Sequence, residues 1–209
     1  MIFTNCRGDK AKLDIVSYYH LKPVVYIRLL NGQRISGCCG PITDKYYLFE
    51  AEHRDTKSIS SFCVGYDCGD QFLKLINHPP LQLFDPFKTE LGVHGGYGNN
   101  GNNNGGQRQV IDPLNKELNN AIHILCSAWG GKAPQGGLRK SLEYINKNPG
   151  RPTNSFAITG FNRIVGKDAK GRTLTQIIAD IRLENPNLRN FTFPLMKQVL
   201  ADEGCSSNL

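Results

Sequence analysis

The feature that most constrains the fold is a tract of glycine and asparagine in the middle of the chain. Residues 92–106 read GVHGGYGNNGNNNGG. Such a segment has too little apolar surface to offset the entropy lost when a chain is ordered, so it is typical of a flexible linker or a long loop. The tract therefore predicts two parts, a first domain over residues 1–91 and a second over 109–209, joined by a linker over 92–108.

The two parts differ in charge. Residues 1–91 contain 11 Lys and Arg against 10 Asp and Glu, whereas residues 92–209 contain 14 against 8. A positive surface attracts phosphate and steers polyanions toward the protein, so the second part is predicted to bind DNA or RNA. A basic face with no partner remains an alternative. The residues predicted to contact nucleic acid are Arg139, Lys140, Arg151, Arg163, Lys167 and Arg172.

Hydropathy and the N-terminal residues indicate a cytoplasmic protein. No window approaches 18 uninterrupted apolar residues, and residues 1–10 lack a basic segment followed by an apolar run. We therefore expect neither a membrane span nor a secretory signal. In the cytoplasm thiols are kept reduced, so clustered cysteines are more often metal ligands or catalytic groups than disulfides. The oligomeric state is left open by the sequence.

Cysteine and histidine concentrate in residues 38–78. The stretch holds Cys38, Cys39, His53, Cys63, Cys68 and His78. A buried free cysteine replaces a small apolar residue and needs no histidine nearby, so this density favours a metal site. Structural zinc is bound by four nitrogen or sulfur ligands in a tetrahedron. The preferred set is Cys39, His53, Cys63 and Cys68, with Cys38 and His78 as substitutes, and the alternative is a group of buried thiols with two surface histidines.

Local patterns place these residues on a β-rich domain. The β-branched and aromatic residues of 24–30 predict a strand, and Asn31-Gly32 favours a two-residue turn that returns the chain as a partner strand over 33–36. Residues 46–53 and 60–65 predict two further strands, and apolar spacing predicts a helix from Gly69 to Pro79. The hairpin brings the chain to the two adjacent cysteines.

A resemblance to a known kind of domain rests on this order. Residues 39–42 (CGPI), the strand ending at His53 and residues 64–69 (VGYDCG) opening a helix resemble small treble-clef or zinc-knuckle domains of bacterial and phage proteins. The resemblance covers about forty residues and implies a bound zinc ion. The sequence departs from the knuckle at Ser36, where a first cysteine is expected. Cys38 is not expected to replace it, because neighbouring side chains on an extended segment point to opposite faces.

An alternative hypothesis for the same stretch is that it forms the active site of a metal-dependent nuclease. Asp44, Glu50 and Glu52 lie on or beside the strand predicted over 46–53, and such enzymes use strand carboxylates to hold Mg²⁺ against a phosphate. Such a site is expected to have a lysine at the next alternate position of the strand, and this chain has Arg54 there instead. A solvated strand face explains the same residues, so whether the protein is an enzyme remains open, and a non-enzymatic role is favoured.

The second part predicts helices. Asp112 and Pro113 are a suitable start for a helix over 113–129, residues 138–145 predict another, and Thr173 with Gln176 has the spacing of a capping box. Residues 156–158 and 164–165 are interpreted as short strands or connectors. We therefore expect an α+β protein, with a small zinc-stapled β-rich domain and a basic helical domain, that binds nucleic acid without catalysis. A protein-interaction adaptor is a further alternative.

Overall fold

The protein is mixed α and β, and its strands and helices are unevenly distributed between two units. The computed structural model describes residues 3, 5–88, 111–131 and 134–209. Within these residues the first compact unit ends at Asp85 and the second begins at Pro86. All described strands belong to the first unit and five helices to the second, which confirms the predicted α+β class. The linker predicted over 92–108 lies outside the described residues.

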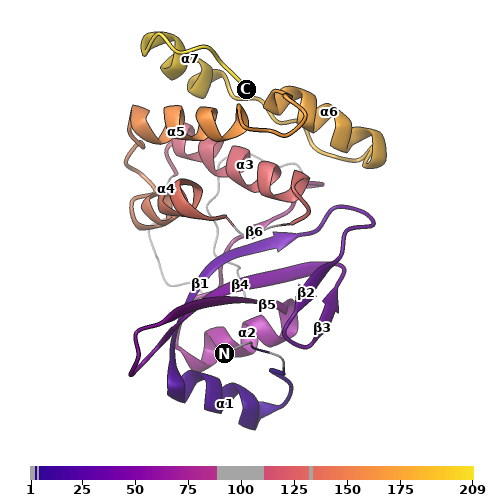
Figure 1. The fold of residues 1–209 in the computed structure, drawn as a ribbon, viewed down its shortest axis with the longest axis vertical. Helices are drawn as coiled ribbons and strands as arrows, with labels where there is room; N and C mark the ends of the chain where they lie inside the picture. Colours follow the sequence, from indigo (N-terminus) through magenta and orange to yellow (C-terminus); the bar gives the residue numbers. More distant parts are fainter. Residues whose placement is uncertain (1–2, 4, 89–110, 132–133) are drawn as a thin grey trace, which may run out of the picture. The chain divides into compact units, whose positions relative to one another are not determined.

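The first unit combines two helices, a four-stranded sheet and a two-stranded ribbon (Figure 1). Its elements are α1 Asp9–Tyr18, β1 Tyr19–Arg28, β2 Ile35–Gly37, β3 Gly40–Ile42, β4 Lys45–His53, β5 Ile59–Gly65, α2 Tyr66–Leu75 and β6 Leu83–Phe84. The sheet has the order β5-β4-β1-β6, in which β6 alone runs parallel to its neighbour. Both helices pack on one face of the sheet (Figure 1).

Aromatic side chains form the core between this face and α2. Residues alternate in direction along a strand, so Tyr47, Phe49 and Ala51 of β4 share one face, and all three are buried. The Phe49 ring lies 5.6 Å from that of Phe72 on α2. Gly69 of α2 packs directly on the Tyr47 ring, where a Cβ atom would clash. The absence of a side chain at Gly69 therefore lets α2 approach the sheet.

The predicted hairpin is only partly confirmed. Asn31-Gly32 does form a turn, with Gly32 at a φ of 74° and the Gln33 amide donating to the Leu30 carbonyl at 3.0 Å. The residues after this turn do not pair with β1, because β4 and β6 occupy the two sides of that strand. They pair instead with β3, in the separate two-stranded ribbon. Helix α1 was not predicted from the sequence.

The second unit is a group of helices around α3. The helices are α3 Pro113–Ala128, α4 Gly136–Lys147, α5 Ser155–Val165, α6 Leu174–Glu184 and α7 Pro194–Asp202. Helix α3 contacts each of the other four. Asp112 accepts hydrogen bonds from the first-turn amides of α3, and Thr173 and Gln176 form the predicted capping box of α6. The capping signals in the sequence therefore locate two of the helix starts.

Helix α5 corrects the prediction for residues 156–158 and 164–165, which are helical rather than extended. The Asn154 side chain accepts a hydrogen bond from the Ala157 amide at 3.0 Å and so begins the helix. Ile158, Phe161 and Val165 follow at spacings of three and four residues and are all buried. Burial of this stripe outweighs the β propensity of the separate short runs.

None of the helices in the described part of the chain is both long and apolar enough to cross a membrane.

Candidate metal centre

Three cysteines meet in the first unit. The sulfur atoms of Cys6, Cys38 and Cys39 all lie within 4.8 Å of one another. Cys6 and Cys38 form a disulfide, and the Cys39 Sγ is 3.4 Å from the Cys38 Sγ. Within the described residues this is the one group of histidine, cysteine and acidic side chains close enough to hold a metal ion. The cluster is therefore compatible with a zinc-knuckle-like segment.

The turn between β2 and β3 explains why adjacent cysteines can share a site. Gly37 pairs with Gly40, so Cys38 and Cys39 are the two residues of a hairpin turn. Side chains alternate along a strand but not around such a turn, which is why the expectation that Cys38 points away from Cys39 is wrong. The Cys38 amide donates to the Cys63 carbonyl at 2.8 Å and fixes the turn on β5.

Cys6 comes from the segment before α1. This segment lies outside residues 38–78, where the metal ligands are predicted. The Cys6 side chain is fully buried. The neighbouring Arg7 donates from Nη2 to the Cys39 carbonyl oxygen at 3.1 Å and so ties this segment to the turn. No spacing rule links residues 32 positions apart, so the sequence gives no direct signal for this pairing.

Cys68 adds a fourth thiol beside Cys39. It lies in the first turn of α2 and packs against the same core cluster as Cys39. Burial raises the pKa of the Cys68 thiol, the Lys12 ammonium opposes this shift, and the charge and hydrogen bonding of the Cys39 thiol add to it. Cys68 is therefore a neighbour of Cys39, but it is not among the sulfur atoms that lie within 4.8 Å of one another.

The other predicted zinc ligands are placed elsewhere. Cys68 is followed by Gly69, which packs on Tyr47. His53 lies six positions further along β4 than Tyr47, roughly 20 Å at about 3.3 Å per residue. The His53 Nδ1 instead accepts from the amides of Asp55 and Thr56 at 3.2 and 3.3 Å. His53 therefore supports the turn after β4.

Cys63 and His78 also lie apart from the cluster. Phe62 and Val64 face the core that contains the clustered cysteines, so alternation directs the Cys63 side chain to the other face of β5. Burial raises the pKa of the Cys63 thiol to about 11. His78 is exposed, with its Nδ1 2.7 Å from the Pro79 carbonyl oxygen. Of the preferred set, the structure thus brings together Cys39 and Cys68 and adds the substitute Cys38.

The carboxylates of the nuclease alternative do not converge. Asp44 forms ion pairs with Arg28 and Lys45 at 3.5 and 4.0 Å, at the start of β4. Glu52, near the other end, lies 3.7 Å from the Lys57 Nζ, and Glu50 stands opposite Ser61 in the sheet. Mg²⁺ needs carboxylates that meet at one point. Asp44, Glu50 and Glu52 do not provide such a point.

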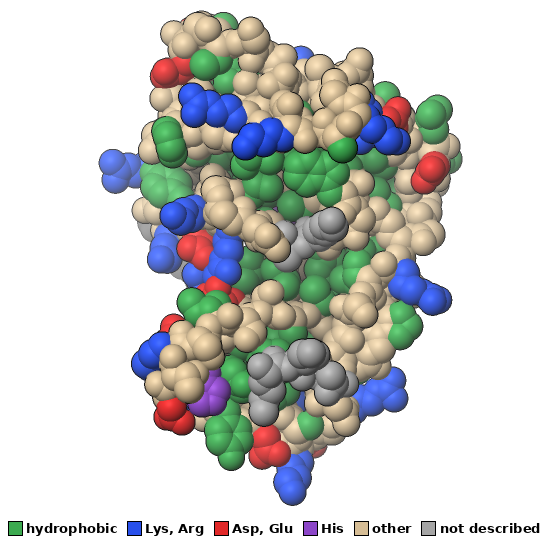
Figure 2. Space-filling view, in the orientation of Figure 1, with side chains coloured by type: hydrophobic (Ala, Val, Ile, Leu, Met, Phe, Trp, Pro, Cys, Tyr) green, Lys and Arg blue, Asp and Glu red, His purple; other side chains and the backbone are tan. Residues whose placement is uncertain are grey.

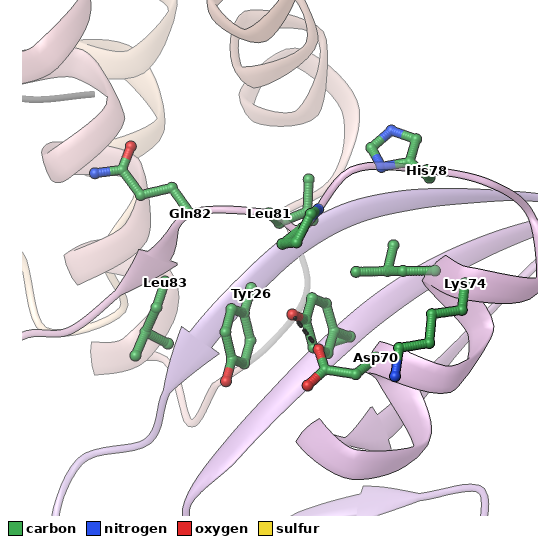
Figure 3. Close-up of a pocket in the computed structure, with 10 residues that line it drawn as sticks. Tyr26, Asp70, Lys74, His78, Leu81, Gln82 and Leu83 are labelled. Atoms are coloured by element: carbon green, nitrogen blue, oxygen red, sulfur yellow. Dashed lines mark hydrogen bonds between the residues drawn. The ribbon is translucent and has the colours of Figure 1, made fainter. Parts of the chain in front are cut away.

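The first unit also contains a cavity of about 530 Å³ beside α2 (Figure 3). The Tyr26 ring stacks on that of Tyr47 at 4.0 Å, and the Tyr47 hydroxyl donates to the Asp70 Oδ1 at 2.8 Å. Burial, together with the Asp70 charge, raises the pKa of Tyr26 to about 12. Leu81 and Leu83 add apolar walls. The polar side chains of Lys74, His78 and Gln82 complete the lining.

The predicted nucleic-acid contacts lie on different elements of the second unit. Arg172 bonds Asp168 through Nε and Nη2 at 3.0 and 2.9 Å and Asp180 through Nη1 at 2.7 Å. This arginine lowers the pKa of Asp168 well below its usual range. Arg139 pairs with Glu143 at 3.1 Å. Both arginines therefore have structural roles.

The remaining four predicted contacts are exposed. Lys140 lies on α4, Arg151 in the connection between α4 and α5, Arg163 on α5, and Lys167 just after it. In the described residues none of the four forms an ion pair. Lysine and arginine side chains are spread across the visible face of this unit rather than gathered at one point (Figure 2).

Fold and site together define a two-unit α+β protein with three cysteines close enough to one another to hold a metal ion. Residues 4–205 match the family described as Uncharacterised conserved protein UCP028583, and the chain belongs to this family. No curated protein and no solved structure matches the chain.

Proposed function

We propose that the cysteine cluster is a structural zinc site that fixes the fold of the first unit. Its four ligands are the thiolates of Cys6, Cys38, Cys39 and Cys68. The supporting observation is that three sulfur atoms lie within 4.8 Å of one another with a fourth thiol beside them. Structural zinc takes four such ligands in a tetrahedron. All four thiols must be available, so the proposal applies to the reduced chain.

Positive groups near the cluster support an anionic centre. Zinc with four thiolates carries a net charge of −2, which needs compensation when it is partly buried. The Lys12 side chain is only 4% exposed and lowers the pKa of Cys68. Cys68 also lies in the first turn of α2, where the amide dipoles favour a thiolate. Lys12 thus offsets part of the rise in the Cys68 pKa that burial causes, and it supplies positive charge beside the proposed centre.

A zinc ion at this place would join three separate segments. The ligands come from the segment before α1, the turn between β2 and β3, and the first turn of α2. Binding of structural zinc contributes on the order of 10 kcal/mol at neutral pH, comparable with the entire net stability of a domain. The site would therefore act on folding rather than on a substrate.

The metal content of the reduced protein tests this proposal. We expect one zinc ion per wild-type chain and less than a tenth of that in Cys39→Ser and Cys68→Ser, measured by elemental analysis after desalting. Cys63→Ser and His53→Ala are matched controls, because their side chains lie away from the cluster, and both should keep one zinc. A folded, metal-free wild type, or loss of zinc in Cys63→Ser, would contradict the proposal.

We propose as the molecular activity that the second unit binds nucleic acid without cleaving it. The support is the excess of Lys and Arg in residues 92–209 and the exposure of Lys140, Arg151, Arg163 and Lys167. Phosphate contacts of this kind supply affinity and orientation but carry no sequence information directly. Binding is therefore expected to depend steeply on salt and weakly on sequence.

Titration of labelled DNA and RNA at several salt concentrations tests this activity. Lys140→Glu and Lys167→Glu should each weaken binding and lower the slope of log affinity against log salt by about one. Lys10→Glu, an exposed lysine of the first unit, gives the same change in net charge and should have little effect. Affinity that does not change with salt would overturn the proposal. Cleavage of the probe with Mg²⁺ would instead support the nuclease.

A further inference from the structure

The cysteine cluster offers two arrangements that exclude each other. In one, all four sulfur atoms are thiolates that bind zinc, as proposed above. In the other, Cys6 and Cys38 form a disulfide and leave Cys39 and Cys68 as thiols, which is the arrangement in the structure. A sulfur atom in a disulfide is no longer a thiolate ligand. Zinc occupancy and the disulfide therefore compete for the same two cysteines.

The backbone already accommodates the disulfide form. The Cα atoms of Cys6 and Cys38 are 5.9 Å apart, within the range that a disulfide spans without movement of the chain. The turn that holds Cys38 is fixed on β5 by its amide, and Arg7 ties the segment of Cys6 to the same turn. Because these contacts are made by the backbone and by Arg7, they do not depend on the state of the sulfur atoms.

The other two thiols stay beside the disulfide. The Cys39 Sγ lies 3.4 Å from the Cys38 Sγ, and Cys39 also interacts with Cys68. The disulfide form thus already places three of the four proposed ligands within 4.8 Å of one another, and zinc binding after reduction requires Cys68 to approach Cys6 and Cys38.

We propose that this cluster is a redox-controlled zinc clasp in which a hydroperoxide converts the zinc form into the Cys6–Cys38 disulfide form. This proposal rests on the zinc site proposed above. The two thiolates give up one electron each and form the S–S bond, while the O–O bond of the peroxide breaks and its oxygen atoms take up two protons, which gives two waters from hydrogen peroxide or one water and one alcohol from an organic hydroperoxide. Zinc leaves as Zn²⁺ without changing its charge, and Cys39 and Cys68 take protons from solvent.

The two states differ in which segments they join. Zinc joins the segment before α1, the β2–β3 turn and α2, whereas the disulfide joins only the first two. Oxidation therefore keeps the N-terminal segment attached but removes the zinc link between the first turn of α2 and the turn that carries Cys39. In the disulfide form α2 is held by its packing on the aromatic core without this link, so we expect it to open more often than in the zinc form.

The test starts from the reduced, zinc-loaded full-length chain. Hydrogen peroxide is added in steps, released zinc is measured with a chromogenic chelator, and disulfides are mapped by alkylation and mass spectrometry. We expect one zinc ion released for each Cys6–Cys38 disulfide formed. Dithiothreitol with added zinc should restore the loaded form. Hydrogen exchange should increase in α2 and remain unchanged in α3.

Variants separate this pairing from general oxidation. Cys63→Ser should release zinc as the wild type does, and Cys126, a buried thiol whose pKa burial raises to about 12, should stay unmodified. Cys6→His keeps a possible zinc ligand but cannot form the disulfide, so its zinc release should slow at least tenfold. The mapping on the wild-type chain gives an answer even if Cys6→His does not load zinc.

The outcomes distinguish this inference from the proposal on which it depends. Reduced protein that holds no zinc overturns both. Zinc that stays bound after the Cys6–Cys38 disulfide has formed, or release that accompanies a different disulfide, overturns the redox clasp alone. Zinc that is released without any disulfide also overturns it, because thiolate oxidation would then follow another route.

Discussion

The two units stabilise their buried polar and sulfur groups by different means. In the second unit, the fully buried Asn115 donates from Nδ2 to three backbone carbonyls at 2.8 to 3.3 Å and accepts from the Thr153 amide at 2.8 Å. This side chain fixes the connection between α4 and α5 on α3. The bonds need no ion and no change of oxidation state.

Asn162 has the same function at the C-terminus. Its Nδ2 donates to the Ser206 carbonyl at 2.8 Å, and its Oδ1 accepts from the Asn208 amide at 2.7 Å. The last residue, Leu209, is buried as a result. Together with the Asp168–Arg172 pair, these contacts make the second unit stable by hydrogen bonds within its own chain.

In the first unit sulfur adds a further kind of long-range link to hydrogen bonds such as that between Tyr47 and Asp70. The Cys6–Cys38 disulfide depends on oxidation, and the zinc site proposed for Cys6, Cys38, Cys39 and Cys68 would depend on metal. The difference teaches that the two units should respond independently to metal and redox conditions. Changes that affect one unit and leave the other intact therefore test the comparison.

The largest expected effect is loss of zinc from the reduced chain. Treatment with a chelator and a reductant, or the change Cys68→Ser, removes a contribution of roughly 10 kcal/mol, about the whole stability of a small domain. Hydrogen exchange should then lose protection in β4 and α2. The fluorescence of Trp129, the single tryptophan, should stay native because that residue belongs to the second unit.

Cys63→Ser in the same conditions is the control, because the Cys63 side chain lies outside the cluster. Equal loss of protection in both units, or a first unit that stays protected without metal, would show that the two units are not stabilised differently.

The second-largest effect is expected for Asn115→Ala. The change leaves buried backbone groups of the α4–α5 connection without partners, at a cost on the order of 3 kcal/mol in the free energy of unfolding of the second unit. Denaturant titration followed by Trp129 fluorescence measures this cost. Zinc content should stay unchanged, since the first unit has no part in these bonds.

Asn146→Ala removes the same side chain from an exposed position on α4 and should change the stability by less than about 0.5 kcal/mol. A similar loss in both variants would mean that helix propensity, rather than the buried hydrogen bonds, controls the result.

Much of this fold could be predicted because its signals are local. The strands over 46–53 and 60–65 follow from short runs rich in apolar and aromatic residues, and the start of α3 follows from the capping residue Asp112. The spacing of Ile158, Phe161 and Val165 was also present in the sequence, but short β-branched runs were given more weight than the helical stripe. The structure shows that the buried helical stripe determines the conformation of these residues.

The metal site was less predictable because it depends on long-range placement. Cys6 lies outside the stretch of residues 38–78 in which cysteine and histidine concentrate, and only the fold brings it to Cys38. The rule for extended chains predicts that Cys38 and Cys39 point to opposite faces, whereas the two residues form a turn. His53 satisfied the composition of a zinc site but is held at the far end of β4. The sequence thus predicts which residue types could bind a metal, but it does not predict which of them lie close together in the fold.

A smaller effect is expected for Gly69→Ala in the first unit. A Cβ atom at this position would overlap the Tyr47 ring, which is itself buried and held by its bond to Asp70. Such overpacking typically costs about 1–3 kcal/mol. Thermal unfolding of the zinc-loaded protein, followed by near-ultraviolet circular dichroism, measures the loss, and α2 should be the first element to lose hydrogen-exchange protection.

Gly65→Ala provides the matched control, because a Cβ atom at Gly65 meets no atom within 4 Å and the backbone there has a φ of −61°. If both alanine variants lose the same stability, the close contact between α2 and the sheet is not the cause.

The smallest effect is expected for Tyr26→Phe and appears only at high pH. The pKa of Tyr26 is raised from 10.0 to about 12 in the folded chain, mainly by burial, so folding favours the neutral phenol. Its contribution to stability is fully present below pH 10 and is lost as the pH rises from 10 to 12. Denaturant midpoints of the first unit between pH 8 and 12 should therefore fall less steeply in Tyr26→Phe than in the wild type. A variant that keeps the full decline would assign it to another group, such as Cys63, whose pKa is about 11.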